Sequence, residues 1–169
     1  MPSTNQNNSL VCYCIAIIVA LTGFTFLSQH EKSIDANETT ATTQHRDIQC
    51  KIESLIRTIT DDPDEFGRST PSVYELTKIG KPATRQLLQV LEEKDNAEIR
   101  WMAVRALKRI YAKQYGFIEG GVGWKSQKHY INFRAFWDSL GNLHVNSTFR
   151  ECRAAVKKWY KWLDSQGIE

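Results

Sequence analysis

Apolar side chains recur every three or four positions along most of the chain after residue 46, which is the spacing of amphipathic helices. The first such stripe predicts a helix from Asp47 to Thr60, with which the folded part of the chain begins. The apolar positions of this stripe are Ile48, Ile52, Leu55, Ile56 and Ile59. No strand-like alternation appears between residues 47 and 110, so this part of the chain is expected to be helical throughout.

Capping residues predict where the next helices begin and end. Thr70 supplies a capping hydroxyl and Pro71 a proline at the first helical position. Gly80 suits the C-terminal end of that short helix, because glycine readily adopts the left-handed conformations that end helices. Pro82 then restarts the chain, and a further helix follows it.

A longer helix is expected to end at Ile110, after a capping-box-like start made by Asp95 and Glu98. One side of it is apolar and consists of Ile99, Met102, Ala103, Ala106, Leu107 and Ile110. The basic residues are expected at its edges or in water. They are Arg100, Arg105, Lys108 and Arg109.

Residues 116–146 differ from the helices around them, because they are rich in glycine and aromatic residues. They contain one plausible short helix, from about Tyr130 to Leu140. A final helix is expected from about Ser147 to Gln166. Its apolar side consists of Phe149, Cys152, Ala155, Trp159, Trp162 and Leu163.

The N-terminal part of the chain has a different character. Residues 10–27 contain no charged side chain and are long enough to cross a membrane as a helix. A polar segment, 1–9, precedes them. Residues 28–46 are polar and threonine-rich, as expected of a flexible linker. The sequence thus predicts a single-pass membrane protein with the folded part at 47–166.

Other interpretations of residues 10–27 remain open. A cleaved signal peptide would leave a secreted or periplasmic protein, although the segment lacks a preceding basic residue and an Ala-x-Ala-like site. A buried core helix is the third alternative. Pairing of Cys50 with Cys152 stays open as well, because two cysteines alone indicate little.

Two helical segments resemble one another. Residues Ala103–Ile110, AVRALKRI, align with Ala155–Trp162, AVKKWYKW, as Ala-Val-x-x-large-x-x-large at an offset of 52 residues. Similarity at such a period indicates stacked helical hairpins. In such a stack, a small alanine allows a neighbouring helix to approach closely. Chance similarity of two amphipathic helices is the alternative.

Residues Leu76–Ile110 resemble a HEAT-like repeat of the phycobilisome-lyase type. The matching positions are Leu76, Ile79, Gly80, Ala83, Leu87, Leu91, Ile99, Arg100, Ala103, Leu107 and Ile110. The resemblance implies an all-α fold, a short α-solenoid of two to three stacked helical hairpins, with residues 116–146 as an insert. We expect the first helix of the folded part and the tryptophan-rich last helix to cap the stack. Lys94 and Cys152 depart from the family pattern.

Charge is unevenly placed along the chain. Residues 81–169 hold sixteen Lys and Arg against nine Asp and Glu, whereas residues 1–80 hold six against ten. Basic and aromatic side chains alternate in the insert and the last helix, which is typical either of a core covered by lysine stems or of a binding surface. The candidate binding residues are Arg105, Lys108, Arg109, Trp124, Lys125, Lys128, Arg134, Lys157 and Lys161.

No motif of a catalytic or metal site stands out. The glycine run Gly120–Ser126 lacks the adjacent Gly-Lys-Ser of a phosphate loop, and no histidine pair has metal-ligand spacing. We therefore expect a membrane-anchored, non-enzymatic scaffold that binds an unknown protein partner and needs no cofactor or metal. One alternative is a bilin-attaching, lyase-like accessory subunit that uses Cys50 or Cys152. The other is a nucleic-acid-binding repeat, although nucleic acid is a less expected partner than protein.

Overall fold

The structure, a computed structural model, describes residues 42–120 and 123–167. The predicted membrane segment 10–27, with the polar residues before it and most of the predicted linker, lies outside the described residues. Within the described part, no helix has the length and hydropathy of a membrane span. Contacts divide the chain between Asp47 and Ile48, and the unit Ile48–Glu169 carries every feature discussed below.

The first described helix covers residues 42–57. It includes residues before Asp47, where the helix was predicted to begin. Residues 42–46 contain no proline or glycine, and an exposed polar segment without such residues readily extends a helix that packing has already formed. Ile52 and Ile59 of the predicted stripe are fully buried, as their spacing requires.

Helix α2, Pro71–Ile79, confirms the predicted start and end. The Oγ1 atom of Thr70 accepts a hydrogen bond from the Val73 N–H at 3.2 Å. Gly80 ends the helix with φ 80° and ψ −138°, a conformation that is open in practice to glycine alone. A 3-10 turn, Lys81–Ala83, then leads into α3, Thr84–Glu93.

Helix α4, Ala97–Gln114, is capped by Asn96 and not by Asp95. The Asn96 side chain accepts hydrogen bonds from the N–H groups of Glu98 and Ile99. Asp95 instead accepts a hydrogen bond from Arg100 at 2.9 Å. Both residues are competent caps, and Asp95 is engaged by Arg100, five residues further along the chain, while its neighbour caps the helix.

The insert contains a small antiparallel hairpin that the sequence did not predict. Strands β1, Phe117–Ile118, and β2, Gly123–Trp124, pair with Phe117 opposite Trp124. Their rings lie 5.3 Å apart between centroids, and two residues per strand are too few to leave a recognisable alternation. The predicted helix of the insert is present as α5, Gln127–Ser139.

Helix α6, Phe149–Ser165, completes the described structure. Its Trp159 is fully buried and contacts aromatic rings from both α4 and α5, namely Tyr111 at 4.9 Å and Trp137 at 5.4 Å between centroids. Trp159 thus joins α6 to α4 and α5, while α6 as a whole lies beside α3. Its buried positions are Cys152, Ala155, Val156, Trp159 and Leu163.

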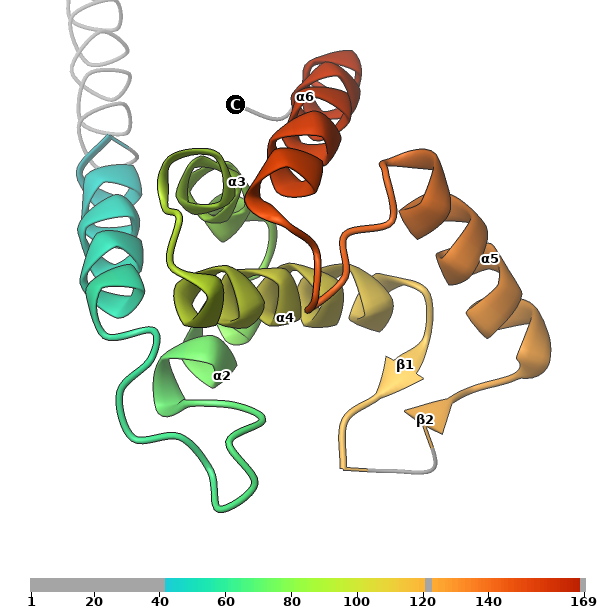
Figure 1. Ribbon diagram of the computed structural model, residues 1–169, viewed down its shortest axis with the longest axis horizontal. Helices are drawn as coiled ribbons and strands as arrows, with labels where there is room; N and C mark the ends of the chain where they lie inside the picture. The colour runs from blue at the N-terminus through green and yellow to red at the C-terminus, as the bar shows by residue number, and fades with distance from the viewer. Residues whose placement is uncertain (1–41, 121–122, 168–169) are drawn as a thin grey trace, which may run out of the picture. The chain divides into compact units, whose positions relative to one another are not determined.

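Helices dominate the described residues, which confirms the predicted all-α class apart from the short hairpin. Figure 1 shows α4 between α2 and α3, with α6 beside α3. Ala103 and Ala155 are both buried, at 0% and 3% exposure. Gly141, in the turn after α5, lies close to Ala155, because an added Cβ on Gly141 would lie 2.8 Å from the Ala155 Cβ.

Arg100 is buried, in contrast to its predicted place at a helix edge, with 9% of its surface exposed. Besides its bond to Asp95, it lies 5.7 Å from the ring centroid of Phe149. It also acts on the thiol of Cys152, which lies 52 residues further along the chain, at the offset that aligns the two similar segments. Burial raises the pKa of Cys152, and the charge of Arg100 opposes that rise.

Candidate functional site

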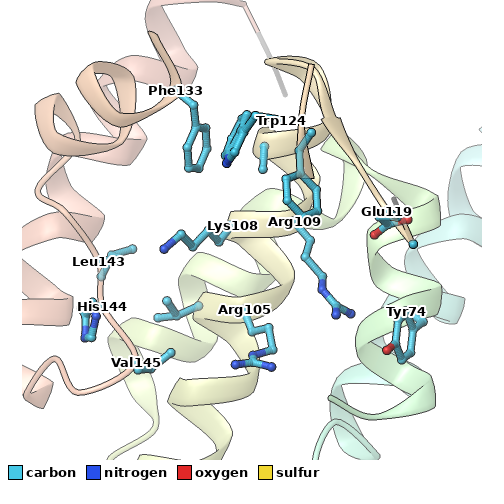
Figure 2. Close-up of a pocket in the computed structure, with 14 residues that line it drawn as sticks. Tyr74, Arg105, Lys108, Arg109, Glu119, Trp124, Phe133, Leu143, His144 and Val145 are labelled. Atoms are coloured by element: carbon cyan, nitrogen blue, oxygen red, sulfur yellow. The ribbon is translucent and has the colours of Figure 1, made fainter. Parts of the chain in front are cut away.

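A cavity of about 550 Å³ lies beside the C-terminal half of α4. Four parts of the domain line it, as Figure 2 shows: α4 itself, α2, the β1–β2 hairpin with the start of α5, and the loop between α5 and α6. The volume is within the range of sites that enclose small ligands or single side chains of a partner. We call this cavity the α4 pocket. Its lining residues are Tyr74, Val104, Arg105, Lys108, Arg109, Ala112, Phe117, Glu119, Gly120, Trp124, Phe133, Leu143, His144 and Val145.

Three cations from one helix surround the pocket. Arg105, Lys108 and Arg109 are three and four positions apart on α4, so their side chains share one side of that helix. In Figure 2, Lys108 extends toward the loop that carries Leu143, while Arg109 extends toward Tyr74. The positive charge is therefore spread around the cavity and not gathered at a single point.

The two arginines are fixed by the segment before α2. Arg105 donates a hydrogen bond from Nη1 to the carbonyl oxygen of Arg68, and Arg109 donates from Nη1 to Oγ of Ser69 at 2.9 Å. The Arg109 guanidinium also lies 4.5 Å from the ring centroid of Tyr74. Each arginine uses one N–H in this way, so the other N–H groups remain directed to the cavity side or to solvent.

No carboxylate in the described structure forms an ion pair with these cations. Among the described residues, none lies within 4.0 Å of the charged nitrogens of Arg105, Lys108 or Arg109. Glu119 is the one acidic side chain that lines the pocket. Burial lowers the pKa of Arg105, and the positive charge of Arg109 lowers it further, although the negative charge of Asp64 acts on Arg105 in the opposite direction and raises its pKa. The pocket therefore has a net positive charge that a bound anion would offset.

The inner end of the pocket is apolar and reaches the core. Val104 and Phe133 are each 2% exposed and Leu143 is 1% exposed, yet all three line the cavity. Trp124 lies 5.0 Å from Phe133 between ring centroids, and both rings stand at the same end in Figure 2. This end has no charged group to solvate an ion, so it suits an apolar or aromatic group.

The loop between α5 and α6 forms the opposite wall and is held by specific hydrogen bonds. Trp137 donates from Nε1 to the Leu143 carbonyl oxygen at 2.8 Å in a buried position. The His144 N–H donates to Oγ of Ser147 at 2.9 Å, and the Asn146 N–H donates to Nδ1 of His144 at 3.3 Å. The wall is therefore preformed, which lowers the entropic cost of binding.

The structure brings four of the nine predicted binding residues together in this pocket: Arg105, Lys108, Arg109 and Trp124. Lys157 lines a different hollow. The remaining four are exposed and line neither cavity, and Arg134 lies 3.7 Å from Asp138 as an ion pair. These four are Lys125, Lys128, Arg134 and Lys161.

Several pocket residues were absent from the predicted set. Tyr74 is 43% exposed on α2, outside the apolar stripe of that helix, and this exposed aromatic is the one signal that could have marked it. Leu143, His144 and Val145 belong to an irregular loop that no periodicity places. Phe133 carries the spacing of a core residue, and it is indeed buried while it lines the cavity.

A second hollow, of about 450 Å³, lies along α6. Its lining consists of Phe149, Arg150, Arg153, Ala154 and Lys157. It is basic, but all its residues come from one helix and only Phe149 supplies an aromatic ring. It therefore lacks the enclosed apolar end that distinguishes the α4 pocket.

Two cysteines lie in the described residues. Cys50 is exposed and Cys152 buried, and both are free thiols. Burial raises the pKa of Cys152, which opposes formation of the nucleophilic thiolate. No group of three or more His, Cys, Asp or Glu side chains within the described ranges is arranged to hold a metal ion.

Comparison with known proteins gives no relative: no family profile, curated protein or solved structure matches the chain. The geometry of the α4 pocket is therefore the basis for a functional argument.

Proposed function

We propose that the protein is a non-enzymatic helical binding module, with HEAT-like stacking of its helices, that holds an acidic segment of a protein partner in the α4 pocket. In this proposal, residues 10–27 anchor the module in a membrane. The observation that carries the proposal is the cationic rim of Arg105, Lys108 and Arg109, which has no close carboxylate partner in the described structure.

The composition of the pocket supports a protein partner. Arginine, tyrosine and tryptophan are the residues in which protein interfaces concentrate their binding energy, and Tyr74, Arg105, Arg109 and Trp124 all line this cavity. The arginines are already oriented by their bonds to the Arg68 carbonyl and to Ser69, so little side-chain entropy is lost when a carboxylate binds. Electrostatic attraction to an acidic segment would also accelerate its association.

Selection from a random peptide display library tests the proposal with the full-length chain. We expect the selected peptides to be enriched in Asp and Glu, and we expect Lys108→Glu to weaken their binding roughly tenfold through loss of a charge-assisted contact. Lys108 is exposed, so this substitution leaves the core intact. Lys161→Glu is the matched control, because Lys161 is an exposed lysine outside the pocket.

Two results would contradict the proposal. One is a set of selected peptides without acidic enrichment. The other is an equal loss of binding in the Lys108→Glu and Lys161→Glu variants, which would show that net charge and not the pocket governs the interaction.

A further inference from the structure

We infer that the α4 pocket recognises a particular class of segment, one in which a single aromatic side chain is flanked by carboxylates. The inference rests on the proposed function and adds an anchor residue to it. The aromatic ring occupies the apolar end near Phe133, and the flanking carboxylates contact the cations of α4.

The apolar end of the pocket is the first part of the argument. Val104, Phe133 and Leu143 have almost no accessible surface of their own. Phe117 and Trp124, by contrast, are half-buried rings that line the cavity and offer apolar surface to its interior. Such a surface gains free energy when an apolar group replaces water, at roughly 25 cal/mol per Å² of apolar area. Acidic side chains alone leave this end of the cavity unfilled, so charge complementarity by itself does not account for its shape.

Aromatic geometry favours a ring as the anchor. Trp124 and Phe133 lie 5.0 Å apart with planes inclined by 33°, and Phe117 meets Trp124 edge to face with an interplanar angle of 67°. Additional aromatic rings join such clusters in tilted or edge-to-face contacts, which stabilise beyond the buried area. A ring from the partner would extend this cluster toward the pocket interior.

The distribution of charge favours carboxylates on both sides of the anchor. Lys108 extends toward the α5–α6 loop and Arg109 toward Tyr74, as Figure 2 shows. A single small anion cannot contact both Lys108 and Arg109 equally well. An extended peptide, by contrast, presents successive side chains over a length of several residues. An acidic residue before the anchor and another after it match this spread.

A peptide fits these observations better than a single-stranded nucleic acid. Nucleic-acid binding by stacking needs a series of exposed ring faces along a basic groove. Here Phe133 is 2% exposed and Trp124 is half-buried, so neither ring presents a fully exposed face, and both line the same cavity. The site therefore has room for one anchor and not for successive bases.

Fluorescence anisotropy with labelled peptides and the full-length chain tests the inference. The probe is a short peptide with a central phenylalanine and glutamates on both sides. A first comparison peptide replaces the phenylalanine by alanine, and a second replaces the glutamates by glutamine. We expect the alanine peptide to bind at least tenfold more weakly, because the ring contributes a buried aromatic contact, and the glutamine peptide to lose a similar factor.

Two variants locate the contacts. Ala112→Leu fills the apolar end from α4, and Trp124→Ala removes one of its rings, so a folding defect in one variant leaves the other as a test. Both residues line the pocket. In either variant we expect the phenylalanine and alanine peptides to bind with equal affinity. Lys108→Glu should still weaken the binding of both peptides to these variants.

The outcomes separate the inference from the proposed function. Equal binding of the phenylalanine and alanine peptides to the wild-type chain, with both weakened by Lys108→Glu, overturns the inference and leaves the proposed function standing. Failure of both peptides to bind overturns both. Displacement of the peptide by an oligonucleotide that binds more tightly and depends on Lys108 overturns the inference in favour of a nucleic-acid site.

Discussion

The guanidinium carbon of Arg109 lies 4.5 Å from the centroid of the Tyr74 ring, and this contact joins α4 to α2 at the edge of the pocket. Cation–π contacts at exposed sites contribute about 0.5–1 kcal/mol. The same arginine donates to Ser69, so Arg109 is held from two directions. A cation that is fixed before the ligand arrives is the arrangement on which the proposed binding depends.

Replacement of the Tyr74 ring therefore has a defined consequence. We expect Tyr74→Ala to lower the free energy of unfolding by about 0.5–1 kcal/mol through loss of the ring contact with Arg109. Tyr74→Phe retains the ring and is expected to leave stability unchanged. Urea denaturation of the two variants measures the difference, and equal midpoints for them would show that the ring contributes nothing.

The turn after α5 approaches α6 too closely for a side chain. A Cβ at Gly141 would lie 2.8 Å from the Ala155 Cβ, and φ of Gly141 is +101°. We expect Gly141→Ala to destabilise the domain by about 1–3 kcal/mol. In a double-mutant cycle, Ala155→Gly should recover part of that loss, because it removes the 2.8 Å contact with the Cβ but neither the 3.0 Å contact with the Cα of residue 155 nor the backbone strain.

Gly80 provides the control for this cycle. Its φ is +80° but no atom lies within 4 Å of an added Cβ. Gly80→Ala is therefore expected to be destabilising without any coupling to Ala155→Gly. A coupling of zero for the Gly141 pair would contradict the close approach of the turn to α6.

The pocket wall depends on one buried hydrogen bond. Trp137→Phe leaves the Leu143 carbonyl oxygen without its donor, at a cost of about 1–3 kcal/mol. Trp159→Phe is the matched control, because Trp159 is buried and its Nε1 has no hydrogen-bond partner among the described residues. Thermal denaturation should show a larger loss for Trp137→Phe, and an equal loss in both variants would contradict the role of this bond.

Acidification is expected to weaken the start of α6. Hydrogen bonds from the Thr148 N–H and hydroxyl lower the pKa of Glu151 from its ordinary value of 4.5. The lowered pKa means that the carboxylate stabilises the folded state above pH 4.5, and that this contribution is lost as the pH falls through the folded-state value. The Glu151→Gln variant has no titrating group at this position, so its free energy of unfolding should vary less with pH below 5 than that of the wild-type chain. Equal pH dependence of the two unfolding free energies would contradict this.

Local signals in the sequence predicted the helices well. Thr70, Pro71 and Gly80 define both ends of α2, because capping and proline geometry act within a few residues. The start of α4 was misplaced by one residue, since Asp95 and Asn96 are both good caps and the choice depends on Arg100, which takes Asp95 as its partner. Arg100 is only five residues after Asp95, but the sequence alone does not show which of the two adjacent caps it leaves free.

The pocket could be predicted only in part. The basic and aromatic composition identified Lys108 and Trp124 as candidate contacts. That both line one pocket depends on the β1–β2 hairpin and on the loop held by Trp137. Neither feature has a periodic pattern. The same composition favoured Lys125 and Lys128 equally, which lie outside the cavity, because sequence alone does not show which side of a short element faces a neighbour.

The most direct test of the account maps a bound peptide onto the full-length chain by backbone amide chemical shifts. The probe is the glutamate peptide with a central phenylalanine. The account predicts that the largest changes occur at Val104, Lys108, Phe133 and Leu143, which line the α4 pocket. Changes centred instead on Arg150 to Lys157, around the second hollow, would contradict it.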